Sequence, residues 1–381
     1  MLTRILAIAR KEVRQIKRDK RMLYVLFVFP FILLVLFGYA INFDVHHIKM
    51  FVYDQNKTVD SREFVNRLTS SNYFDVEGYL NAEKEIRGVL DRGDAQVVLV
   101  FPREFSKDIH AGRNAQVQIL VEGVNANTAS IVSNYMNIAT ATFSQNVTSK
   151  ILAGKGRKTN LPLDVEARFW FNADLNSTRY LIPGLISMIL IITAVVSISL
   201  SLVREKERGT KERGTIEQIN VSPLSSMELL VGKTIPYTVI SLAIAGIILV
   251  AGYFLFGVAI KGSLILLFFS TFIFLFAALN LGIFVSAISD SQQVAFQIST
   301  MVSLLPTFIL SGFVFPIESM PPVIQILTNI TPAKFFIIIL RAILLKGVGL
   351  SAFWPQLIYL LLFAAFFLGL AIIINKKSAT A

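Results

Sequence analysis

The sequence predicts an α-helical polytopic membrane protein. Its expected parts are six transmembrane helices, an amphipathic N-terminal interfacial helix and a small α/β extracytoplasmic domain. Of the 381 residues, 54% are hydrophobic and only 16% are charged, whereas an average soluble domain is about 25% charged. Several apolar runs reach about 20 residues or more, which is enough to cross a hydrocarbon core of about 30 Å at ~1.5 Å per residue.

Basic charge gathers beside the apolar runs. Residues 1–21 carry eight Lys and Arg residues against two acids, whereas residues 43–177 hold 15 basic and 16 acidic residues. This distribution is the positive-inside pattern, and it places both termini in the cytoplasm and residues 43–177 outside. The pattern accounts for the net charge of +11, so nucleic acid is not an expected partner.

Cysteine is absent and histidine occurs three times. Disulfides and thiolate metal sites are therefore excluded, and no metal site is expected. His46 and His47 directly follow a predicted span, which favours placement at the membrane interface.

Residues 1–21 form the amphipathic helix. Basic residues surround an apolar stripe at helical spacing, made of Leu2, Ile5, Leu6, Ala9, Val13 and Ile16. We expect this helix to lie in the cytoplasmic interface with the stripe at the acyl boundary. The first span is expected at 22–42, with a kink at Pro30.

Residues 43–177 predict the extracytoplasmic α/β domain. Strands are expected at 48–53, 96–101 and 116–121, and helices at 61–68, 82–90 and 125–152. Alternation of strands and helices is typical of an α/β domain. The sequence has no nucleophile–base pair in a recognisable context there, so a binding or scaffolding role outweighs an enzymatic one. An Arg-Gly-Asp triplet at 92–94 is better explained by Gly93 ending a helix than by adhesion.

Residues 178–381 are expected to hold the other five spans, at 180–203, 234–257, 263–289, 294–315 and 352–374. The interval 316–350 contains four prolines and an apolar run, 335–345, that Arg341 interrupts. Because this run is too short to cross a bilayer, we expect a re-entrant hairpin on the outer side. No span carries an acidic residue at its centre, which argues against an ion-coupled carrier.

The interval 204–233 is dense in charge of both signs and contains a tandem repeat, KERGT at 206–210 and again at 211–215. Pro223 breaks the helical pattern, and Ser225 and Glu228 have capping-box spacing. A short amphipathic helix, a break and a second helix are therefore expected. One interpretation is a docking surface for a soluble partner, and the other is a solvated basic loop that obeys the positive-inside rule.

The tripeptide Gly232-Lys233-Thr234 looks like the end of a nucleotide-binding P-loop. That loop requires a glycine five residues before its second glycine, and Met227 occupies the position. ATP hydrolysis is therefore not expected in this chain.

Three segments together resemble the type-2 ABC transporter permeases. The first is ERGTIEQ-x-x-VSP at 212–223 followed by ELL-x-GK at 228–233. The second is LSGF-x-FP at 310–316, followed by Met320-Pro321, Gln325 and Pro332. The third is RFWFN at 168–172 followed by Ile-Pro-Gly at 182–184, which resembles the start of the second span in members that have a large outer domain.

The resemblance implies an exporter of drugs or amphiphiles in the bacterial inner membrane. It implies a separate ABC ATPase subunit that holds ATP and Mg, and a second permease, either another copy or a paralogue. Exporters of this kind often work with a periplasmic adaptor and an outer-membrane channel. No cofactor is expected in this chain, and membrane lipid is a further expected partner.

The resemblance also implies two sets of functional residues. A coupling helix in the 204–233 loop would dock on the ATPase, with Arg204, Glu207, Arg208, Glu212, Arg213, Gly214, Thr215, Glu217, Gln218 and Pro223. The second and fifth spans would line the substrate pathway, with Pro183, Gly184, Ser187, Thr193, Phe308, Ser311, Gly312, Phe313 and Pro316. For the pathway residues, ordinary close packing of small side chains is the competing interpretation.

The repeat departs from the family pattern, which has one ERGT copy. Five added residues turn a continuous helix by about 500°, a net offset of about 140°. Either the extra copy is looped out, at Gly209, or the docking face is rotated.

Two other functions remain as alternatives. The first is a membrane-anchored receptor or sensor that uses its outer α/β domain. The second is an ion-coupled secondary carrier. Six spans exceed what an anchor needs, and the spans lack a central acid.

Overall fold

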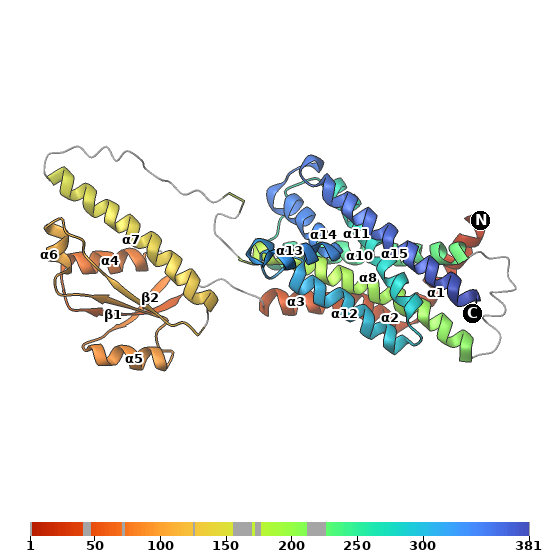
Figure 1. The fold of residues 1–381 in the computed structure, drawn as a ribbon, viewed down its shortest axis with the longest axis horizontal. Coiled ribbons are helices and arrows are strands. Elements are labelled where there is room, and N and C mark those ends of the chain that lie inside the picture. The colour runs from red at the N-terminus through yellow and green to blue at the C-terminus, as the bar shows by residue number, and fades with distance from the viewer. Residues whose placement is uncertain are drawn as a thin grey trace. The chain divides into compact units, whose positions relative to one another are not determined.

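The computed structural model describes residues 2–40, 47–70, 73–124, 126–154, 170–171, 177–211 and 226–380. The chain divides into two compact units (Figure 1). The helical unit comprises Met1–Asn42 and Arg168–Ala381, and the α/β unit comprises Phe43–Ala167.

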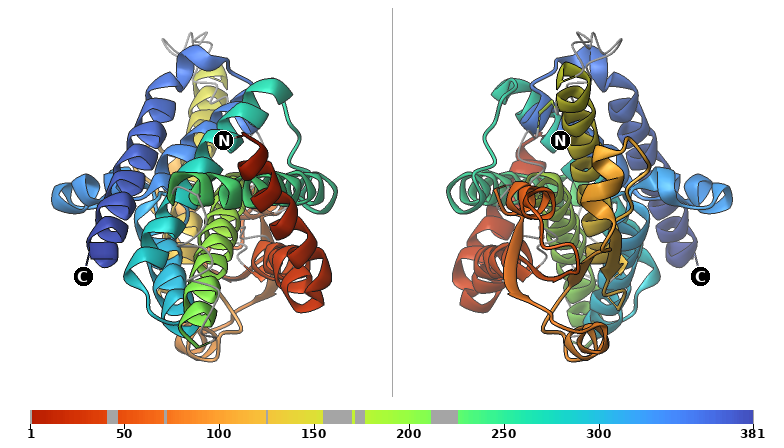
Figure 2. Two further views of the ribbon diagram at one scale, coloured as in Figure 1. Left: turned by 90° about the vertical axis from the view of Figure 1, so that its right-hand side faces the viewer. Right: turned by 90° about the vertical axis from the view of Figure 1, so that its left-hand side faces the viewer.

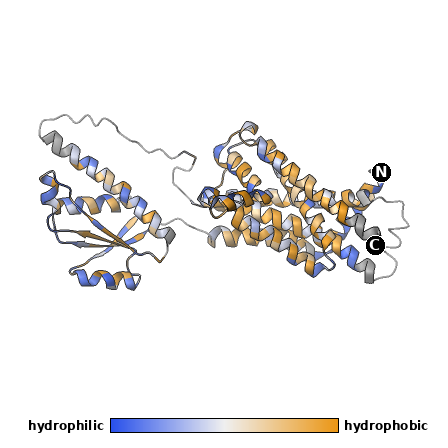
Figure 3. Ribbon diagram, viewed as in Figure 1, coloured by the Kyte–Doolittle hydropathy of each residue, from blue (hydrophilic) through white to orange (hydrophobic). Residues whose placement is uncertain are grey.

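Five helices of the helical unit are long and apolar enough to cross a membrane. They are α8 (Ser177–Lys211), α10 (Ser226–Phe256), α11 (Leu264–Ile288), α12 (Gln292–Leu310) and α15 (Trp354–Thr380). Their apolar character is visible along each helix in Figure 3. A further pair, Pro322–Ile330 and Pro332–Lys346, would make a sixth span if taken as one, but it is bent by 92°. This bend is consistent with the hairpin expected from the proline-rich sequence.

The expected first span contains a shorter apolar helix, Leu26–Ala40. The N-terminal elements are α1 (Leu2–Arg18), α2 (Lys20–Leu23), a π-helical turn at Tyr24–Val28 and α3 (Phe29–Ala40). Pro30 cannot donate a backbone hydrogen bond, and just before it the Phe29 N–H donates to the Tyr24 carbonyl, one residue further back than in an α-helix. A widened turn therefore precedes the proline at which the kink was predicted.

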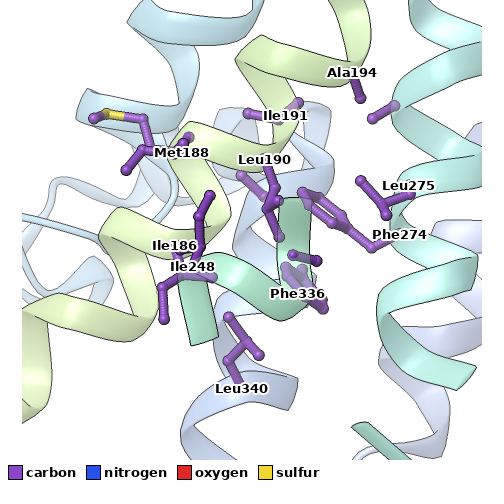
Figure 4. Packing of buried hydrophobic residues seen from close by; sticks show 14 of the residues in the cluster. Ile186, Met188, Leu190, Ile191, Ala194, Ile248, Phe274, Leu275, Phe336 and Leu340 are labelled. Atoms are coloured by element: carbon purple, nitrogen blue, oxygen red, sulfur yellow. The ribbon is translucent and has the colours of Figure 1, made fainter. Parts of the chain in front are cut away.

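Helix α8 runs through the middle of the helical unit (Figures 1 and 2). Of its most apolar window 78% is buried, against 17% for α15 and 22% for α12. The buried side chains of α8 meet those of α11 and of α14 (Pro332–Arg341), as Leu190, Phe274 and Phe336 illustrate in Figure 4. The Phe274 and Phe336 rings stack with centroids 4.0 Å apart. The outer helices α12 and α15 therefore present apolar faces away from this core.

The α/β unit contains a four-stranded sheet in the order β2-β1-β3-β4. The strands are β1 (Ile48–Asp54), β2 (Phe74–Tyr79), β3 (Val97–Phe101) and β4 (Gln118–Val121). Strand β1 pairs in parallel with β2 and with β3, and β4 is antiparallel to β3. The helices are α4 (Val59–Thr69), α5 (Glu83–Asp91), α6 (Phe105–His110) and α7 (Ala126–Gly154). Helices α4 and α7 cover one face of the sheet and α5 lies on the other (Figure 1).

Strand β2 and helix α6 were not predicted from the sequence. Burial alternates along β2, but only Phe74 is fully buried. The Arg-Gly-Asp triplet ends α5 as expected: Gly93 has a φ of 72°, and its N–H donates to the Leu90 carbonyl. Arg92 and Asp94 pair with each other at 2.7 Å.

Candidate functional site

Helix α1 packs directly against the beginning of α10. Its buried face consists of Ile5, Ala9, Glu12 and Ile16, at helical spacing. A Cβ atom at Gly232 would lie 2.9 Å from Ile8 Cβ and 3.2 Å from the Ile5 carbonyl oxygen, so this contact requires glycine. The apolar stripe expected to face lipid is therefore divided, because Ile5, Ala9 and Ile16 contact protein while Leu6 and Val13 remain exposed.

A group of charges, buried at Glu12 and Lys233, joins α1, α8 and α10. Lys233 is fully buried, and its Nζ lies 3.5 Å from Glu12 Oε1 and also contacts Glu205 Oε2. Lys11 Nζ lies 2.6 Å from Glu205 Oε1, and Ser201 Oγ donates to Glu12 Oε2 at 3.3 Å. We call Lys11, Glu12, Glu205 and Lys233 the ion cluster. Each of the three helices supplies at least one of its charges.

The ion cluster is electrically balanced, with two ammonium groups and two carboxylates. A buried charge without its partner is costly, whereas a paired and hydrogen-bonded set is tolerated. The pairing of charge therefore favours one arrangement of the three helices. Separating α8 or α10 would leave a net charge behind, and separating α1 would remove one partner from both Glu205 and Lys233.

The last turns of α8 make further contacts with two other segments. Arg204 Nη1 donates to Asp19 Oδ2 at 3.0 Å, beside the α1–α2 junction. Lys206 Nζ donates to the Ser289 carbonyl at 3.2 Å, in the turn between α11 and α12. Gln292 Nε2 donates to Glu207 Oε2 at 2.6 Å in the same region. We call these the α8-end contacts.

The predicted coupling residues are thus split between described and undescribed parts of the chain. Arg204 and Glu207 bind other helices of the same chain, and Arg208 lies on α8. Six others lie between 212 and 218, and the last is Pro223; these seven fall outside the described residues. Of the two interpretations of the repeat, a loop-out at Gly209 does not apply to the first KERGT copy, because α8 continues as one helix of 35 residues through Lys211. A rotated docking face stays a prediction, because residues 212–215 of the second copy lie outside the described residues.

At the opposite end of α8, Arg341 connects three helices. Its Nη2 donates to the Tyr180 carbonyl at 3.2 Å and to the Gly312 carbonyl at 3.0 Å. Its guanidinium carbon lies 3.7 Å from the centre of the Tyr180 ring, a cation–π geometry. The Tyr180 hydroxyl also donates to Gly312 O, at 3.2 Å. Arg341, Tyr180 and Gly312 form what we call the Arg341 cluster.

Some of the predicted pathway residues meet where α8 contacts the residues that follow α12. A Cβ atom at Gly184 would lie 2.2 Å from Phe313 Cδ2, and Phe313 is fully buried against this glycine. Gly312 has a φ of 76°, which lets the chain turn just after α12. Phe308 is half-buried beside Phe313, with ring centroids 5.9 Å apart. Pro183 is buried in α8 and Pro316 is exposed.

The hydroxyl groups of this set point into helix packing. Ser187 and Ser311 are buried, and the Ser311 hydroxyl donates to the Thr307 carbonyl of its own helix. The Thr193 hydroxyl donates to the Ile189 carbonyl at 2.7 Å. Ser187 Oγ has no hydrogen-bond partner among the described residues. Buried small residues are typical of closely packed membrane helices, which is the competing interpretation for these positions.

Sequence reasoning missed the ion cluster. One signal was available, because Glu12 stands in line with Ile5, Ala9 and Ile16 on the buried face of a basic helix. Its partners could not be assigned, since Lys233 and Glu205 are far away in the sequence. Among the residues that the structure describes, no group of three or more His, Cys, Asp or Glu side chains could hold a metal.

Comparison with known proteins identifies the family. A model described as ABC-2 family transporter protein matches residues 20–373. Probable multidrug ABC transporter permease YbhR of Escherichia coli (strain K12) is 31% identical over 96% of each chain. Probable multidrug ABC transporter permease YbhS of the same organism is 31% identical over 98% of this chain and 97% of its own length.

A eukaryotic relative is similar over part of its length. ABC transporter G family member 20 of Dictyostelium discoideum is 25% identical over 99% of this chain and 51% of its own. The family match covers nearly the whole chain, and the bacterial relatives align almost from end to end. The chain therefore belongs to the ABC-2 family of transporter proteins, as a membrane-spanning permease of the ABC type.

Proposed function

We propose that this chain is the permease subunit of an ATP-driven exporter that moves drugs or other amphiphilic compounds out across a bacterial cytoplasmic membrane. The observation that carries the proposal is the end-to-end similarity to two relatives named as probable multidrug ABC transporter permeases. A separate ABC ATPase would supply the energy, with ATP and Mg bound in that subunit.

In this proposal both termini and residues 212–225 face the cytoplasm, and the α/β unit lies outside. The charge distribution supports this orientation, because residues 1–21 are strongly basic and residues 43–177 are nearly neutral. The N-terminal segment 22–42 would be the first of six spans. A second permease, either a copy or a paralogue, would complete the pathway, and an adaptor with an outer-membrane channel would extend it.

The contacts at the end of α8 support a mechanism for coupling. The ATPase would bind residues 212–225 and move them as it hydrolyses ATP. Glu205 is bound to Lys11 and Lys233, and Glu207 is bound to Gln292. Displacement of the α8 end would therefore be transmitted at once to α1, α10 and the turn before α12. The α8–α12 contact at Gly184 and Phe313 lies on the moving helix.

The test is transport in vesicles that contain the purified chain and its ABC ATPase. We expect ATP-dependent export of a fluorescent amphiphile, which persists when the membrane potential is dissipated. Glu212→Lys and Arg213→Glu should reduce both ATPase binding and export. Glu77→Lys and Lys84→Glu, which reverse exposed charges in the α/β unit, are the matched controls.

Two results would contradict the proposal. One is normal export by both charge-reversed loop variants together with no ATPase bound to the purified chain. The other is loss of transport when the potential alone is removed, which would favour an ion-coupled carrier.

A further inference from the structure

The two faces of the sheet in the α/β unit are covered unequally. One face is filled by α4, α6 and α7, whose buried residues include Phe64, Phe105 and Met136. Among the described helices, the other face is covered by α5 alone, a helix of nine residues. Beyond α5, the side chains of Tyr53, Val100 and Leu120 are only half-buried. An apolar strip of sheet is therefore left partly open.

This strip forms the floor of a cleft of about 460 Å³, which we call the α5 cleft. Its apolar lining is Tyr53, Ile86, Leu90, Val100, Pro102 and Leu120. Its polar lining is Gln55, Glu83, Arg87, Asp91 and Gln118. A volume of this size and a mixed lining with a few polar groups are typical of small-molecule sites.

The topology places the α5 cleft where ligands bind in open α/β sheets. The connection from β1 to β2 contains α4, and the connection from β2 to β3 contains α5, on the opposite face (Figure 1). The connections that leave β1 and enter β3 therefore lie on opposite faces of the sheet, which makes the position between these two strands a topological switch point. Gln55 and Pro102 directly follow the carboxyl ends of these two strands. Ligands characteristically bind at such a switch point, outside the carboxyl ends of the strands.

The charges around the cleft favour a ligand that carries a positive charge. Arg87 Nε lies 3.3 Å from Asp91 Oδ2, so these two charges compensate each other. Glu83 is exposed at the rim and has no ion-pair partner among the described residues. The cleft therefore has one uncompensated negative charge above an apolar floor that includes the Tyr53 ring. Carboxylates and aromatic rings both attract organic cations.

We propose that the α5 cleft binds a cationic amphiphile, with its apolar body on Tyr53, Val100 and Leu120 and its positive charge at Glu83. This binding is a property of the α/β unit itself and requires neither ATP nor transport. It can therefore fail or succeed independently of the proposed export function.

The chain contains no cysteine, which allows a direct protection experiment on the full-length protein. Gln118→Cys places one thiol at the rim of the cleft, and Thr142→Cys places a control thiol at an exposed position on α7. Both variants are studied in phosphatidylcholine nanodiscs with a maleimide reagent. The probes are tetraphenylphosphonium and tetraphenylborate, which have similar shapes and opposite charges.

We expect tetraphenylphosphonium to slow modification of Gln118→Cys by about tenfold at ten times its apparent Kd, as mass action requires. Tetraphenylborate should not protect this thiol, and neither probe should protect Thr142→Cys. In the Gln118→Cys background, Glu83→Gln should weaken the apparent affinity roughly three- to tenfold, and Glu83→Asp should retain most of it. Glu85→Gln removes a charge from the same helical turn outside the cleft and should have no effect.

Three outcomes would overturn the proposal. They are no protection of Gln118→Cys, equal protection of both thiols, and equal protection by the two probes. Equal weakening by Glu83→Gln and Glu85→Gln would also overturn it, because the effect would then come from helix charge and not from a contact in the cleft.

Discussion

Lys233 is a buried cation whose charge is neutralised by carboxylates from two other helices. Glu12 comes from α1 and Glu205 from α8, and both contact the same ammonium group. Nothing in the residue types alone distinguishes this lysine from the many that face solvent. Its role follows from the burial of the group and from the glycine beside it, which lets α1 approach.

Removing this cation should be costly. Lys233→Met leaves one excess negative charge in the ion cluster, so we expect the free energy of unfolding to fall by about 3–5 kcal/mol. Thermal unfolding of the purified chain in detergent measures the loss. The double variant Lys233→Met/Glu12→Gln restores neutrality and should recover most of it. A double variant as unstable as the single one would show that charge balance is not the cause.

Two glycines offer a matched pair for testing helix contact. Gly184→Ala would put a Cβ 2.2 Å from Phe313 Cδ2, and the overpacking should destabilise the chain by about 1–3 kcal/mol. Gly246→Ala on α10 meets nothing within 4 Å, so it should be neutral or stabilising by up to ~1 kcal/mol through helix propensity. Unfolding in detergent compares the two. Equal effects would mean that the α8–α12 contact at Phe313 is loose.

At the level of whole elements, the KERGT repeat allows two effects to be tested separately. One is the position of the loop that follows α8, and the other is the set of α8-end contacts. Deleting residues 206–210 brings Lys211 and Glu212 to the positions of Lys206 and Glu207, so the α8-end contacts can re-form with identical residues. The deletion shortens α8 by ~7.5 Å, so the loop that follows begins closer to the turn before α12. We expect unchanged thermal stability and a large loss of ATP-dependent export.

The complementary variant is Lys206→Ala/Glu207→Ala, which removes the contacts with Ser289 and Gln292 and keeps the length of α8. It should weaken export less than the deletion does, with a small loss of stability. Full export by the deletion variant would show that the distance between the α8-end contacts and the loop does not matter.

Long helices were predictable from the sequence, including one with weak apolar spacing. Helix α7 was expected at 125–152 and is observed at Ala126–Gly154, and the five long apolar helices lie where the apolar runs predicted. Strand β2 was missed because it is held by pairing with β1, and only one of its side chains is buried. The interruption at Arg341 was visible, but its partners Tyr180 and Gly312 lie on distant helices. Contacts between residues that are far apart in the sequence depend on packing, which a linear pattern does not record.

At the level of the whole molecule, the proposed function predicts different neighbours for the outer helices α12 and α15. Both expose large apolar side chains, including Leu305 on α12 and Leu362 on α15. The proposed function brings a second permease to the fifth span and leaves lipid on the sixth.

The lack of native cysteine makes this distinction measurable. Leu305→Cys should form a covalent dimer with a short bis-maleimide cross-linker in membranes, whereas Leu362→Cys should remain monomeric. Cross-linking only at Leu362→Cys would place the second permease on α15 and remove α12 from the proposed pathway.

The tandem repeat has a consequence for how this transporter can evolve. Because both copies are KERGT, a gain or loss of one unit by replication slippage presents the same lysine and glutamate to the turn at Ser289 and Gln292. The fold of the helical unit would be inherited unchanged while the reach of the loop changes in steps of five residues. A change in the number of KERGT units alone could therefore fit such a chain to a different ABC ATPase, before any point mutation is selected.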